Sequence, residues 1–152
     1  MSDSEWAKDR LRVFHASLSE KSQKDAVFLE EQRIRNESAD TLRSQLVAAF
    51  NEKHIAINRE AGRQLLTIIL EPGTRNFALR RNEPTIQAID VKWEGTAVLL
   101  KGGKDNFLDS RFDVQVDRES GTGYFADRFS AGQKTSPDKI AERAIEHLLF
   151  VH

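Results

Sequence analysis

Histidine side chains are the groups of this chain best suited to metal binding or acid–base catalysis. The four histidines, His15, His54, His147 and His152, lie far apart in the sequence. None belongs to an HExxH motif or to a pair four residues apart, the spacing that places two ligands on one helix face. Hydrolase or lyase chemistry would require His54 or His147 to meet a carboxylate in a cleft. Because no such constellation is visible, we expect no metal, no cofactor and no enzymatic activity.

A row of carboxylates is the second candidate. Asp109, Asp113 and Asp117 recur at every fourth residue, and alternation places them with Gln115 on the outward face of a strand. Paired carboxylates can act as general acid and base when their environments differ. A solvated row of like groups instead favours an aggregation-resistant surface. The glycine segments Gly102-Gly103-Lys104 and Gly121-Thr122-Gly123 join strand to strand, so we interpret them as hairpin turns rather than phosphate loops.

Basic and aromatic residues occur together in the middle of the chain: Arg75, Arg80, Arg81, Lys92 and Lys101 accompany Phe77 and Trp93. This combination on a sheet can bind single-stranded nucleic acid through phosphate contacts and base stacking. Alternation, however, places Trp93 on the same face as Ile89 and Val91, which is a core face, and the formal net charge is −1. We therefore do not expect nucleic-acid binding.

Length and composition limit the remaining classes of protein to which this chain could belong. A chain of 152 residues is long enough for a stable core without a metal or a disulfide, and it contains no cysteine. The acidic start lacks the pattern of a signal peptide, and the longest apolar run, 65–70, is too short to span a membrane. We expect a cytoplasmic protein with no membrane partner.

The charges are distributed unevenly along the chain. Residues 63–104 hold seven basic and four acidic side chains, whereas residues 105–127 hold two basic and six acidic ones. This distribution favours charge pairing between neighbouring strands.

The elements that would position these groups change in character near Gly62. Helical spacing dominates before it: residues 6–35 read as one helix with a polar stretch at 19–25, where a bend is equally compatible with the pattern. A second helix would start from a cap at Ser38 or Asp40 and carry the stripe Leu42, Leu46, Val47 and Phe50. The sequence leaves the end of this helix open: Ile55 and Ile57 alternate around Ala56, so the segment after His54 is also compatible with an extended chain, and Gly62 is the predicted stop of a helix that continues.

Strand patterns follow Gly62. Short alternating runs bounded by turn residues predict strands at 65–70, 77–81, 85–93, 97–101, 111–117 and 124–129, paired antiparallel. Ser136 is expected to cap a last helix whose first residue is Pro137. The fold class is therefore α+β, with two N-terminal helices, an antiparallel sheet of five or six strands, and a C-terminal helix packed on the sheet.

The N-terminal helix is where we expect a partner to bind. We divide the chain into a helical arm, residues 1–36, and an α+β domain, residues 37–152. Trp6, Phe14 and Leu18 are large apolar residues of the arm, and they form an interface if the arm does not fold back on the domain. The leading hypothesis is a non-enzymatic assembly module that forms a homodimer, or binds another protein, through these residues. The alternative is a carrier of small apolar ligands, with a pocket between the sheet and the C-terminal helix that is lined by Val91, Trp93, Phe112, Val114 and Ile145.

Overall fold

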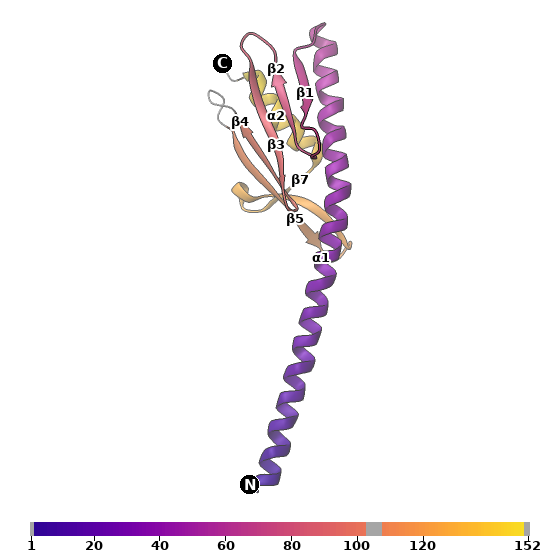
Figure 1. Ribbon diagram of the computed structural model, residues 1–152, viewed down its shortest axis with the longest axis vertical. Helices are drawn as coiled ribbons and strands as arrows, with labels where there is room; N and C mark the ends of the chain where they lie inside the picture. The colour runs from indigo at the N-terminus through magenta and orange to yellow at the C-terminus, as the bar shows by residue number, and fades with distance from the viewer. Residues whose placement is uncertain (1, 103–107, 151–152) are drawn as a thin grey trace. The chain divides into compact units, whose positions relative to one another are not determined.

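The structure is a computed structural model that describes residues 2–102 and 108–150. It divides into two compact units, Met1–Ile34 and Arg35–His152. In chain order the elements are α1 (Asp3–Ala61), β1 (Leu66–Leu70), β2 (Phe77–Arg81), β3 (Gln87–Glu94), β4 (Ala97–Gly102), β5 (Asp109–Asp117), β6 (Thr122–Asp127), a 3₁₀ turn (Arg128–Ser130), β7 (Gln133–Thr135) and α2 (Pro137–Phe150) (Figure 1).

One helix replaces the two predicted at the N-terminus. Residues 2–61 contain neither glycine nor proline, so nothing in the backbone forces a break. Lys24 also forms an ion pair with Glu20 one turn earlier, at 3.3 Å, within the polar stretch. The expected N-cap at Ser38 is wrong: its Oγ accepts a hydrogen bond from the backbone N–H of Gly123 instead, at 2.8 Å. The predicted end at Gly62 is confirmed, because this glycine follows α1 with φ of +68°.

The sheet contains seven antiparallel strands in the order β1-β2-β3-β4-β5-β6-β7, so each strand pairs with its neighbours in sequence. The prediction of five or six strands missed β7. This strand is only three residues long and reads Gln-Lys-Thr, which carries no apolar alternation. It pairs with β6, where Phe125 lies opposite Thr135. The turn predicted at Gly102-Gly103-Lys104 falls mostly outside the described residues.

The hydrophobic core lies against one face of the sheet, here called the inner face. The pairing register of the strands places residues of the inner face opposite one another: Phe77 lies opposite Val91, and Val114 lies opposite Phe125. The same core includes residues of both helices, namely Leu42, Leu46 and Phe50 from α1 and Ile140, Ala144 and Leu148 from α2. Figure 1 shows α2 lying across the sheet, in agreement with its proximity to β2 and β3. The packing of the C-terminal helix on the sheet, expected from its apolar stripe, is confirmed.

A buried arginine on β2 links the sheet to the C-terminal end of α2. Arg81 is 2% exposed, and its Nη1 donates a hydrogen bond of 2.6 Å to the carbonyl of Leu148 in the last turn of α2. Its Nη2 reaches Thr85. A guanidinium is favoured here because the last carbonyls of a helix are unpaired and carry partial negative charge. At the other end of α2, the Ser136 Oγ accepts the N–H of Lys139, as the predicted cap requires. Arg81 is therefore a structural residue and not part of a nucleic-acid surface.

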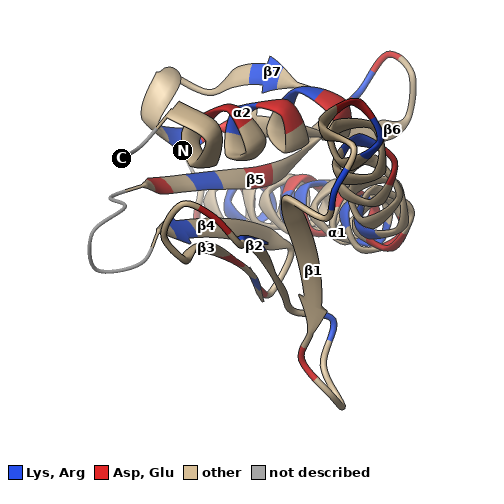
Figure 2. Ribbon diagram, turned by 90° about the horizontal axis from the view of Figure 1, so that it is seen from above, with Lys and Arg blue, Asp and Glu red and all other residues tan. Residues whose placement is uncertain are grey.

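The opposite, outer face of the sheet is polar. Asp90 on β3 lies opposite Lys101 on β4, which in turn lies opposite Asp109 on β5. Figure 2 shows acidic and basic segments alternating along β5. This arrangement agrees with the charge pairing between strands that the basic and acidic stretches predicted.

Candidate functional site

The first unit of the structure exposes large apolar side chains. Trp6, Phe14 and Leu18 are 59%, 54% and 49% exposed. Two further apolar side chains of the arm, Val27 and Phe28, are also more than half exposed. α1 is the single helix or strand among the described residues of this unit, so no second element within it covers these side chains. We call this set of five residues the arm surface; large apolar side chains left exposed together on one segment are typical of interaction sites.

Ion pairs line other positions of the same helical segment. Arg12 contacts Asp9 at 2.8 Å, and Arg33 donates two hydrogen bonds to Glu30. Pairs three residues apart bring neighbouring side chains together on the helix surface and support a helix in water. The segment is thus able to stay helical through local interactions while its apolar side chains remain available to a partner.

A groove in the second unit is the largest hollow that we describe. Its volume is about 670 Å³, and it lies between α1 and the β1–β2 turn. Val47, Leu70, Phe77 and Trp93 supply its apolar wall. The Arg43 guanidinium lies 5.0 Å from the centre of the Trp93 ring, a cation–π contact.

One carboxylate at the groove, that of Asp40, forms ion pairs with two arginines. Asp40 accepts hydrogen bonds from Arg43 at 3.0 Å and from Arg75 at 2.7 Å, and these partners, Arg75 first, lower the pKa of Asp40. One carboxylate of this groove therefore pairs with two guanidinium groups of the same chain. Sequence reasoning missed Asp40, Arg43 and Arg75 as groove residues, because they come from α1 and the β1–β2 turn, whose proximity only the fold reveals.

The residues predicted to line a ligand pocket under α2 are mostly packed core. Val91, Phe112, Val114 and Ile145 are at most 4% exposed. Phe112 also borders a recess of about 190 Å³ beside Ile140 and Arg143. Trp93, in contrast, is half-buried and faces the α1 groove. Trp93 therefore shares the core of the inner face with the other four residues but borders the groove beside α1 and not a pocket under α2.

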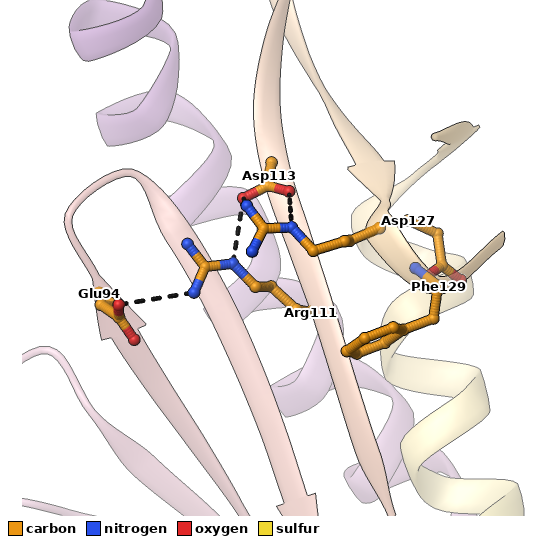
Figure 3. Close-up of polar contacts among 6 residues, drawn as sticks. Glu94, Arg111, Asp113, Asp127 and Phe129 are labelled. Atoms are coloured by element: carbon orange, nitrogen blue, oxygen red, sulfur yellow. Dashed lines mark hydrogen bonds and ion pairs between the residues drawn. The ribbon is translucent and has the colours of Figure 1, made fainter. Parts of the chain in front are cut away.

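The predicted carboxylate row is occupied by structural contacts. Asp113 accepts hydrogen bonds from Arg111 at 3.2 Å and from Arg128 at 3.0 Å, and Arg111 extends the cluster to Glu94 at 3.5 Å. Figure 3 shows this cluster running from Glu94 on β3 to Arg111 and Asp113 on β5, with Asp127 and Phe129 beside it. Asp117 caps its own turn by accepting the N–H of Glu119. Asp113 is thus paired with arginines and Asp117 is used in its turn, whereas Asp109 is exposed at a position opposite Lys101.

Each described histidine has different neighbours. His15 packs beside Phe14 on the arm, with ring centres 5.7 Å apart, and His54 Nδ1 lies 3.1 Å from the Phe50 carbonyl. His147 borders a recess that also touches Asp127 and Glu146, and burial lowers its pKa. His152 lies outside the described residues. Over residues 2–102 and 108–150 no group of three potential ligands is placed to hold a metal ion.

Comparison with known proteins gives no further assignment. No protein-family model, curated protein or solved structure matches this chain. Within the described part of the chain, no helix has both the length and the apolarity needed to cross a bilayer. The fold and site together define an α+β domain, built on a seven-stranded antiparallel meander, that is joined to a helical arm with exposed apolar side chains.

Proposed function

We propose that this chain is a non-enzymatic assembly module of the cytoplasm that self-associates through the arm surface. The observation that carries the proposal is the exposure of Trp6, Phe14 and Leu18 on a helical unit with no covering element of its own. Burying such side chains against a second copy removes apolar area from water, which is the main driving force of association. The absence of cysteine is compatible with a reducing compartment.

The structural use of the polar groups supports a non-enzymatic function. Asp113 and Asp117 are committed to cross-strand and turn contacts, and Arg81 is committed to the end of α2. His15 and His54 lie 39 residues apart on α1, and His147 lies on α2. A catalytic site requires groups that converge on one reacting atom, and the described residues offer no such cluster of metal ligands.

The test is the mass of the chain in solution before and after the arm surface is made charged. Phe14→Glu with Leu18→Glu should lower the mass measured by sedimentation equilibrium, since each buried glutamate would be desolvated. The matched control is Ala16→Glu with Ala26→Glu, which adds the same charge to the same helix at exposed alanines and should leave the mass unchanged. A wild-type chain that sediments as a monomer at all concentrations would overturn self-association and leave another protein as the partner.

A second candidate function rests on the groove beside Trp93. Its apolar wall and its volume of about 670 Å³ suit a small apolar ligand, which moves the predicted carrier site from α2 to α1. Trp6→Phe leaves Trp93 as the single tryptophan, so its fluorescence should respond to a panel of fatty acids and aromatic compounds. Val47→Arg, which fills the groove, should abolish the response. A flat titration across the panel would remove the carrier hypothesis.

A further inference from the structure

The arm carries a regular seam that includes charged residues. Starting at Phe14, positions separated alternately by four and three residues remain on one side of a helix, as in a coiled coil. In this chain these positions are Phe14, Leu18, Lys21, Asp25, Phe28 and Gln32, all within α1. The polar stretch therefore does not interrupt the seam. The polar stretch places one positive charge, Lys21, and one negative charge, Asp25, at the centre of the seam.

We propose that a second copy of this chain docks on this seam in antiparallel orientation, centred on Gln23, so that Lys21 faces the partner's Asp25. This inference rests on the proposed self-association and specifies its orientation and register. By symmetry, Asp25 then faces the partner's Lys21, which gives two opposite-charge contacts at the centre. Leu18 packs against the partner's Phe28 on each side of them. The outermost layer pairs Phe14 with the partner's Gln32.

Charge complementarity selects the orientation. In a parallel dimer in register, Lys21 would face the partner's Lys21 and Asp25 would face the partner's Asp25, two repulsive layers. Antiparallel docking converts both layers into attractive ones. Among the described residues, neither Lys21 nor Asp25 forms an ion pair within its own chain, so both charges are available to a partner. The neighbouring Lys24, by contrast, is already matched by Glu20 at 3.3 Å.

The apolar positions select the register. Consider the antiparallel register in which each residue faces a partner residue seven positions closer to the partner's N-terminus. In that register Leu18 faces the partner's Lys21 and Phe14 faces the partner's Asp25. Each such layer buries a charge against an apolar side chain, which is costly. Only the register centred on Gln23 matches Leu18 to Phe28 and opposite charges to each other at once. A few polar seam residues of this kind fix orientation in coiled coils at some expense of stability.

A cross-linking experiment tests the orientation directly, since the chain contains no cysteine of its own. Leu18→Cys and Phe28→Cys chains, one of them isotopically labelled, are oxidised separately and as a mixture. Residues that face each other across a seam lie within disulfide reach. We expect a disulfide between Cys at 18 of one chain and Cys at 28 of the other in the mixture, and little dimer from either chain alone. Efficient 18–18 and 28–28 disulfides would overturn the antiparallel assignment.

Two further measurements keep the proposal falsifiable if cysteine disturbs the seam. Lys21→Asp should weaken dimerisation at least tenfold, and adding Asp25→Lys should restore it; a parallel dimer would barely respond to the first change. Spin labels at Lys8→Cys should lie about 45 Å apart in the antiparallel dimer, from thirty residues at 1.5 Å each, and under about 20 Å in a parallel one. A monomeric wild-type chain would overturn the proposed function itself, whereas a dimer with the short distance would overturn only the orientation.

Discussion

Replacing Gly123 by alanine should destabilise the second unit through a single close contact. Gly123 lies on β6, where α1 approaches the strand so closely that a Cβ added here would lie 2.5 Å from Ser38 Cβ and 3.1 Å from Val114 Cγ1. Favourable carbon–carbon contacts lie at about 3.5–4.0 Å, so the overlap is about 1 Å. The first contact is with a side-chain atom next to the helix backbone, which cannot rotate away.

The expected magnitude combines three effects. Overpacking of this kind costs about 1–3 kcal/mol. Separating α1 from β6 also lengthens the 2.8 Å hydrogen bond from Gly123 N–H to Ser38 Oγ, which contributes about 1 kcal/mol. Alanine recovers about 0.4–1 kcal/mol by restricting the unfolded chain. The free energy of unfolding should therefore fall by about 2 kcal/mol, which lowers Tm by about 4–8 °C in a chain of this size.

The assay is urea unfolding followed by Trp93 fluorescence in a Trp6→Phe background, so that only the second unit is observed. Ser38→Gly provides the matched control, because it removes the Cβ that alanine would meet. In that background Gly123→Ala should cost less than about 0.5 kcal/mol, which gives a coupling energy of at least about 1.5 kcal/mol. Equal costs of Gly123→Ala in both backgrounds would refute the reasoning and show that the helix is free to move away from the strand.

Three other substitutions test separate parts of the same unit. Arg81→Met should lower the free energy of unfolding by about 2 kcal/mol, because the buried carbonyl of Leu148 loses its donor; a cost below about 0.5 kcal/mol in urea unfolding would contradict this. Burial lowers the pKa of His147 from its ordinary value of 6.5, so the unfolded chain binds more protons as pH falls below 6.5 and stability should decline there. His147→Gln should flatten that part of the pH profile, and an unchanged profile would exclude His147 as the cause. Gly62→Ala should cost about 1 kcal/mol in thermal unfolding, since φ there is +68°; an unchanged Tm would show that another conformation ends α1.

Local signals predicted the second unit well where one short segment decides the outcome. Gly62 ends α1, Ser136 caps α2, and the alternation around Phe112 and Val114 correctly assigns the inner and outer faces of β5. Each of these features depends on backbone conformation or on the period of a single strand. Such information is present in a few consecutive residues.

Other features depend on partners that are distant in sequence. Ser38 has the residue type of an N-cap, but its hydroxyl serves Gly123, 85 residues further along the chain. β7 forms because its backbone pairs with β6, and its side chains carry no strand signal. Trp93 was correctly placed on the inner face with Val91, yet only the fold shows that the space beside it is bounded by Val47 and the β1–β2 turn. The period of a strand identifies its buried face and not the element that covers it.

The sequential order of the strands also has a consequence for the chain as it leaves the ribosome. Each strand from β2 to β7 meets its neighbour as soon as it emerges, because the preceding strand in the sheet is also the preceding one in synthesis. α2 follows all of them, so the nascent sheet keeps part of its apolar face open until Ile140, Ala144 and Leu148 arrive. Until then the Arg81 guanidinium also lacks the Leu148 carbonyl. A translation pause just before α2 would hold the chain in the state most exposed to aggregation and to chaperone binding.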